Sequence, residues 1–158
     1  MRNLIRLILF ALCAIAVLVL AGISTFAQRA RANPTVPPAA QQPLFSEYKG
    51  IRLDMTAEEV RAKLGEPTMK ADDQDYYVFS ENETAQFAYD KAHRVIAISI
   101  DYTGPNAPEA RKVVGTSIEP AANGSLHKMV RYEAHGFWVC YNRTAGANPI
   151  VTITIQKI

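Results

Sequence analysis

Apolar residues with helical spacing first occur in the stretch GIRLDMTAEEVRAKLGEP, residues 50–67. Val60 and Leu64, four residues apart, should lie on one face of a helix. The flanking residues supply a capping box at the start and a glycine–proline stop at the end, namely Thr56, Glu59, Gly65 and Pro67. The stretch therefore predicts a short helix over residues 57–64, in which the carboxylates act as caps and not as catalytic groups.

Runs of alternating apolar and polar residues follow this helix and are typical of β-strands. Two runs flank a short polar turn and predict a hairpin, and a third run completes the set, at residues 76–80, 85–90 and 94–102. In the third run, Ile96, Ile98 and Ile100 are expected to form one apolar face. The first half of the chain thus reads as a helix, a hairpin and a third strand.

The second half of the chain repeats this order of elements. Asn106 is expected to cap a second short helix, with Glu109 at its third position and Gly115 at its end. Strands follow at residues 128–134, 137–142 and 150–156. This self-similarity predicts a tandem duplication of one unit, at about residues 48–102 and 103–158.

Together these elements predict an α+β fold in a single globular domain over residues 44–158. Short helices should pack on one face of an antiparallel sheet of about six strands, because one helix cannot cover three strands on both sides. An antiparallel sheet can leave its other face in water. That open face is where we expect function to lie.

The start of the chain has the pattern of a targeting segment. Arg2 and Arg6 precede an uncharged apolar run, and Thr25 and Ala27 have the spacing of a cleavage site. Residues 1–27 therefore predict a signal peptide. The alternative is an uncleaved N-terminal membrane anchor, since the apolar run is long enough to span a bilayer. Both interpretations predict export, to the periplasm or to a membrane tether that faces it.

Residues 28–43 are rich in proline, alanine and glutamine and have no apolar periodicity, which predicts an extended linker. The charge balance also changes once residues 1–27 are set aside. The 17 basic residues lose two, Arg2 and Arg6, and the remaining 15 equal the 15 acidic residues. A net charge of zero gives no support for nucleic-acid binding, which needs a clustered basic surface.

The helix stretch and the following DYYVFSENETAQFAYDKAHRVIAISI resemble the BamE/SmpA-like outer-membrane lipoproteins and the fold of the β-lactamase inhibitory proteins. The shared pattern is G-x-x-x-x-M-T-x-x-E-V-x-x-x-L-G-x-P, then a tyrosine-bearing strand and a V-x-x-I strand. The matching positions are Gly50, Met55, Thr56, Glu59, Val60, Leu64, Gly65, Pro67, Tyr77, Val95 and Ile98. The resemblance covers about residues 48–102 and implies an envelope protein that acts by contact with other proteins. After residue 27 only Cys140 remains, so neither a lipid-acceptor cysteine nor the disulfides of the inhibitory proteins are present there.

Few residues have the spacing of a chemical site. The histidines, His93, His127 and His135, lie on predicted turns or strand starts without a second metal ligand nearby. The acidic cluster at residues 72–75 lacks the pattern of a calcium-binding loop and is interpreted as solvated. We therefore expect no catalytic residues, no metal and no cofactor, and we do not expect an enzyme.

The aromatic pattern of residues 137–142 is more informative. If Phe137 and Val139 face the core, Trp138 faces the open side of the sheet together with Gln86 and Arg131. Tryptophan beside arginine is typical of a binding hot spot and predicts a protein partner in the cell envelope. The alternative is that Trp138 belongs to the core and the two faces are exchanged.

Two further functions stay open from the sequence. A carrier or sensor could bind a lipid or a small molecule between the helices and the sheet. An accessory domain would have no ligand at all.

Overall fold

The computed structural model describes residues 42–158; the predicted targeting segment and most of the predicted linker lie outside the described residues. The described chain forms short helices and one sheet of seven strands. The elements are α2 (Ala57–Leu64), β1 (Met69–Lys70), β2 (Gln74–Ser80), β3 (Glu83–Tyr89), β4 (Val95–Thr103), α3 (Ala110–Val114), β5 (Leu126–Tyr132), the 3₁₀ turn η1 (Glu133–His135), β6 (Phe137–Arg143) and β7 (Ile150–Lys157). None of the helices in residues 42–158 combines the length and the apolar character of a membrane span.

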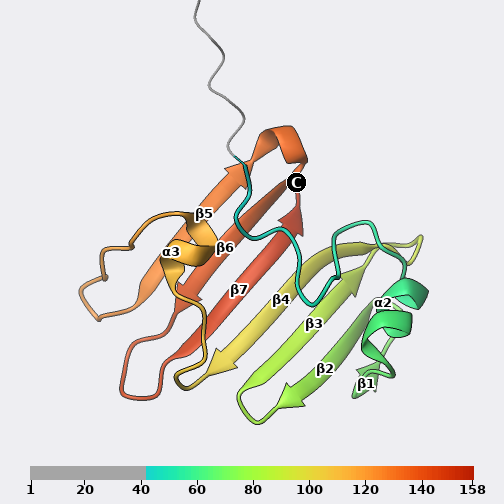
Figure 1. Ribbon diagram of the computed structural model, residues 1–158, viewed down its shortest axis with the longest axis horizontal. Coiled ribbons are helices and arrows are strands. Elements are labelled where there is room, and N and C mark those ends of the chain that lie inside the picture. Colours follow the sequence, from blue (N-terminus) through green and yellow to red (C-terminus); the bar gives the residue numbers. More distant parts are fainter. Residues whose placement is uncertain (1–41) are drawn as a thin grey trace, which may run out of the picture. The chain divides into compact units, whose positions relative to one another are not determined.

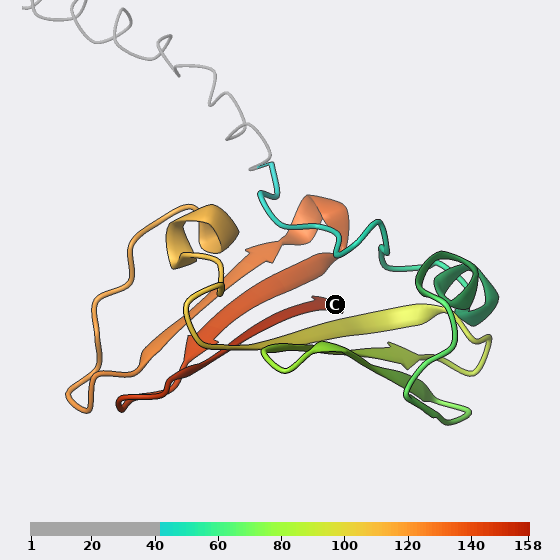
Figure 2. The ribbon, with the colours of Figure 1, turned by 60° about the horizontal axis from the view of Figure 1, so that its bottom comes forward.

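The strands run in the order β1-β2-β3-β4-β7-β6-β5, and every neighbouring pair is antiparallel. Strands β4 and β7 pair at the centre and join the two hairpins into one sheet (Figure 1). Both α2 and α3 lie over the same face, α2 at the β1–β3 side and α3 at the β5–β6 side (Figure 2). The predicted α+β class, with short helices on one face of an antiparallel sheet, is confirmed.

The core lies between this face and the elements above it. Every second strand residue points toward the helices, and these positions carry large apolar side chains. The largest fully buried ones on the central strands are Phe87, Ile98, Ile100, Val139, Ile153 and Ile155. Val60 from α2 and Val113 from α3 are also fully buried, so each helix packs one apolar stripe against its own part of the sheet.

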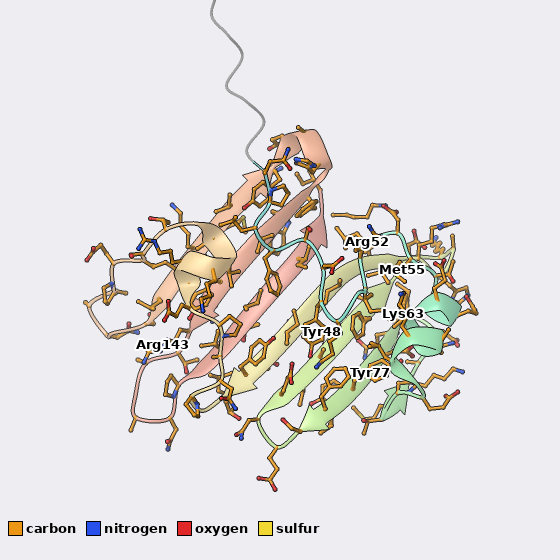
Figure 3. The ribbon with its side chains drawn as sticks, in the orientation of Figure 1. Tyr48, Arg52, Met55, Lys63, Tyr77 and Arg143 are labelled. Carbon is orange, nitrogen blue, oxygen red and sulfur yellow. The ribbon has the colours of Figure 1, made fainter. Side chains whose placement is uncertain are left out.

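The chain before α2 covers the sheet between the helices (Figure 1). Tyr48 and Ile51 of this segment are buried, and Figure 3 shows Tyr48 over the middle of the sheet. The Tyr48 hydroxyl donates a hydrogen bond of 2.8 Å to Glu83, whose carboxylate also lies 3.4 Å from Lys49 Nζ. The pKa of Tyr48 lies well above the ordinary value, mainly because the hydroxyl is buried. The hydroxyl therefore stays protonated and able to donate.

The predicted helix at residues 57–64 is confirmed with the same bounds. The Thr56 backbone N–H donates to Glu59 Oε2 at 2.8 Å, and the Glu59 N–H donates to Thr56 Oγ1 at 3.2 Å. This reciprocal pair is the capping box that the sequence predicts. At the other end, Gly65 adopts φ 82°, a conformation that suits glycine. Local chemistry therefore sets both ends of α2.

One local prediction fails for a steric reason. The predicted cap at Asn106 is wrong, because α3 begins at Ala110 after Glu109 and has no side-chain cap. Ala107 precedes Pro108, and a residue before proline is disfavoured in the helical region, which delays the start of the helix.

The predicted apolar face of the third strand is wrong at one position. Tyr89 pairs with Val95, and the preceding residue pairs with Ala97, so one residue of β4 is left over between them as a bulge. The extra residue is Ile96, which is only half-buried, whereas Val95 is fully buried in its place. Ile98 and Ile100 lie in the core as predicted.

The interpretation of residues 72–75 as solvated is wrong for Asp75. This side chain lies at the start of β2 with 0% exposure and is the only buried charged or polar residue recorded within residues 42–158. Arg61 donates to its two carboxylate oxygens, from Nε at 2.8 Å and from Nη2 at 3.0 Å. Tyr89 Oη donates a third hydrogen bond at 2.8 Å. We call these three residues the Asp75 clamp; it ties α2 to β2 and β3.

A further bond holds the end of α2. The Tyr77 hydroxyl donates to the Gly65 carbonyl at 3.0 Å, and Figure 3 shows Tyr77 beside the helix. Burial raises the pKa of Tyr77 to about 12, so this donor stays protonated at neutral pH. Helix α2 is thus fixed to the sheet by polar contacts at its middle and at its end.

Replacing Arg61 by leucine should destabilise the fold by about 3 kcal/mol, because it leaves the buried Asp75 carboxylate without its cationic partner. Urea unfolding followed by circular dichroism measures the change. Arg111→Leu is the matched control on α3: Arg111 is exposed, and among the described residues none of the ion pairs includes it. We expect the control to change stability by about 0.5 kcal/mol or less. Equal losses in the two variants would contradict the role of the clamp.

Candidate functional site

The face of the sheet opposite the helices is not covered by any helix of the described residues (Figure 2). Its centre carries small polar side chains, including Ser99, Thr152 and Thr154 on β4 and β7. Thr152 Oγ1 donates a hydrogen bond of 2.6 Å to Asp101 across these two strands. The centre of this open face is therefore polar, as expected of a sheet surface in contact with water.

Larger side chains lie toward the edges of the open face, and one group of them is on β5 and β6. We call this group the Trp138 patch; it consists of His127, Met129, Arg131, Trp138 and Cys140. In the hairpin register Arg131 lies opposite Trp138, and Met129 lies opposite Cys140. Directly opposed side chains are close enough to contact each other, so the patch is one continuous surface.

The structure decides between the two orientations of Trp138. Its neighbours Phe137 and Val139 are buried in the core, and successive residues of a strand point to opposite faces. Trp138 therefore points to the open face and is half-buried there. Arg131, predicted to share this face, lies directly across from it.

Arg131 forms an ion pair with one exposed residue, Glu133. Its Nε donates to Glu133 Oε1 at 2.8 Å, and the two side chains are 52% and 70% exposed. Exposed ion pairs contribute little to stability because water screens them. The guanidinium can therefore exchange Glu133 for another carboxylate at small cost.

Gln86, the third predicted site residue, lies on the open face but far from the patch. It is on β3, and β4 and β7 separate β3 from β6. Three strand spacings amount to roughly 14 Å. Its side-chain amide bonds instead to Gln74 of β2. The structure thus brings Trp138 and Arg131 together and leaves Gln86 outside.

One contact in the patch escaped the sequence analysis. Cys140 Sγ lies 3.8 Å from His127 Nδ1, a diagonal contact between β6 and β5. Only the hairpin register, which pairs His127 with Asn142, could have indicated it. Burial raises the pKa of the Cys140 thiol, so the neutral thiol dominates and the pair lacks the thiolate of an activated nucleophile. Within residues 42–158 no three His, Cys, Asp or Glu side chains gather as a metal site would require.

Comparison of the chain with protein-family models, with curated proteins and with solved structures finds no match. The resemblance to the BamE/SmpA-like and β-lactamase inhibitory proteins therefore stays a prediction.

We expect Cys140 to react with iodoacetamide more slowly than free cysteine at pH 7.5, because its raised pKa lowers the fraction of thiolate. The rate should rise as the pH increases above 8.5. Peptide-resolved mass spectrometry separates Cys140 from Cys13. His127→Gln is the control and should leave the rate within about twofold, since burial alone is the cause of the shift. A reaction faster than free cysteine that slows in the variant would instead indicate a thiolate–imidazolium pair.

Proposed function

We propose that this protein is an exported cell-envelope protein that acts by protein–protein contact through the open face of its sheet. The observation that carries the proposal is the Trp138 patch. A half-buried tryptophan lies opposite an exposed arginine on a face that no described helix covers (Figure 2). Tryptophan and arginine are the residue types most enriched at the energetic centres of protein interfaces.

The patch also indicates the chemistry of the partner. Met129, which is 43% exposed, and Trp138 offer apolar contact. Arg131 and His127 add hydrogen-bond donors at the same edge. A partner surface that combines apolar side chains with a carboxylate would match this composition, because its carboxylate could replace Glu133 on Arg131.

The proposals of export and of a family resemblance rest on the sequence alone. The order of elements in the fold supports a further proposal, that the domain is a duplicated unit. Helix α2 precedes β2, β3 and β4, and α3 precedes β5, β6 and β7. The third strands of the two halves, β4 and β7, pair with each other, so that Ile98 lies opposite Ile155 and Ile100 opposite Ile153. We infer from this arrangement two tandem units of one BamE-like or inhibitor-like design. Export follows from the pattern of residues 1–27.

The contact function is favoured over a carrier or sensor of lipids or small molecules. A carrier needs free space between its helices and its sheet. Phe87, Ile98 and Val139 fill the middle of this region with full burial, and the segment that holds Tyr48 covers the sheet between the helices. Open space remains at the end of the sheet beside α3, where Ala110 and Tyr141 line a small cavity.

Trp138→Ala and Phe137→Ala, at neighbouring positions of β6, separate binding from folding. Trp138→Ala should cost about 1 kcal/mol of stability, since this side chain lies on the open face and is only partly buried. Phe137→Ala should cost about 3 kcal/mol, because it leaves a cavity in the core. Thermal unfolding measures both. Equal losses in the two variants would place Trp138 in the core and contradict the proposal.

Binding itself is tested by site-specific photo-crosslinking in the source cell. A photoreactive residue at position 138 should give a covalent adduct with a protein, and Arg131→Glu should reduce the adduct at least fivefold by repelling a carboxylate. A photoreactive residue at position 111, on the exposed side of α3, is the control and should give no adduct. Equal adducts at the two positions, or none at 138, would contradict binding through the open face.

A further inference from the structure

Two cavities meet at the end of the sheet where β6 runs into the loop before β7. The larger has a volume of about 740 Å³ and the smaller of about 360 Å³. Arg143, the last residue of β6, lines both, as do Pro105 and Pro149. Figure 3 shows Arg143 at this end of the sheet, away from α2. The site is thus distinct from the Trp138 patch and does not depend on it.

Arg143 is half-buried and has no acidic partner. Among residues 42–158, none of the ion pairs and none of the side-chain hydrogen bonds includes its guanidinium. Arg61 and Arg94 contrast with it, since Arg61 binds Asp75 and Arg94 donates to the Asp54 carbonyl at 2.9 Å. A guanidinium that has lost part of its water without gaining an acceptor is at an energetic disadvantage. An external anion would remove that disadvantage.

The lining of the larger cavity suits an anion. No aspartate or glutamate lines it, and Arg143 is its one charged residue. Two amide side chains, Asn82 and Asn148, also line it. The side-chain oxygen of Asn82, Oδ1, accepts a hydrogen bond of 2.9 Å from the Thr103 hydroxyl. The side-chain NH₂ group of Asn82 is therefore left to donate to a ligand. Among the side chains around this space, the free N–H donors therefore outnumber the acceptors.

The rest of the lining is apolar and comes largely from Pro105, Pro149 and Ile150. The smaller cavity is less suited to an anion because Glu109 lines it. Glu109 and Arg143 act in opposite directions on the pKa of Tyr141, whose upward shift comes mainly from burial. In the larger cavity, by contrast, no carboxylate of the lining competes with a bound anion for Arg143.

We propose that the larger cavity binds an anionic group, a carboxylate or a phosphate, attached to a small apolar body. Arg143 binds the anion with its planar fork of N–H donors, which matches both groups in a bidentate geometry. The Asn82 and Asn148 amides add hydrogen bonds, and the prolines contact the apolar body.

Nuclear magnetic resonance titration of the ¹⁵N-labelled protein tests this proposal, with hexanoate, hexyl phosphate and hexylammonium as probes. Hexanoate or hexyl phosphate should shift the backbone amides of Gly104 and Asn148 and the side-chain amide of Asn82 in a saturable manner. Hexylammonium has the same apolar chain and the opposite charge, and it should not. The stronger of the two anions identifies the preferred group.

Variants assign the site. Arg143→Gln should weaken the binding of the preferred anion at least tenfold, and Arg143→Lys should weaken it less because it keeps the charge but loses the fork. Arg111→Gln, on the exposed surface of α3, should leave the affinity within twofold. The spectrum of each variant without ligand, compared with that of the wild-type protein, shows whether the variant is folded. No shift with either anion, an equal response to hexylammonium, or unchanged affinity in folded Arg143→Gln would overturn the proposal.

Discussion

The buried carboxylate of Asp75 is the constraint on which the arrangement of this fold depends. A carboxylate inside a protein costs several kcal/mol unless it is paired and hydrogen-bonded. Here Arg61 of α2 and Tyr89 of β3 satisfy it with three hydrogen bonds of 2.8 to 3.0 Å. The requirement can be met only while α2 lies on that face of the sheet. The buried charge thus holds α2 on the face that the apolar strand residues make the core, and the opposite face stays available for contact with other molecules.

The two halves hold their helices by different means. Helix α2 has the Asp75 clamp, a capping box and the bond from Tyr77 to Gly65. Helix α3 has five residues and no side-chain cap, and it rests on the burial of Val113 and Val114. The Trp138 patch and the Arg143 cavity both involve the half with the simpler helix. Polar anchoring is concentrated in one half, and the candidate contact sites lie largely in the other.

Local signals let the sequence predict α2 residue for residue and six of the seven strands within about two residues, because caps, glycines and alternation act between neighbouring residues. The two-residue edge strand β1 was not predicted. The errors depend on contacts that are distant in sequence. Asp75 looked solvated beside Asp72 and Asp73, because its partners lie fourteen residues away on either side. Alternation placed Trp138 and Gln86 on the same face, but strand order, which no local pattern encodes, keeps them apart. Arg143 gave no signal, since the lack of a partner is visible only in three dimensions.

A double-mutant cycle on Arg61 and Asp75 tests the dependence on the clamp most directly. Arg61→Leu, Asp75→Leu and the double variant are compared by urea unfolding. The clamp predicts that the double variant is more stable than the sum of the single losses implies, by about 2 kcal/mol or more, because the second change removes the stranded group left by the first. Losses that add within about 0.5 kcal/mol would show that the two side chains act independently and would contradict the account.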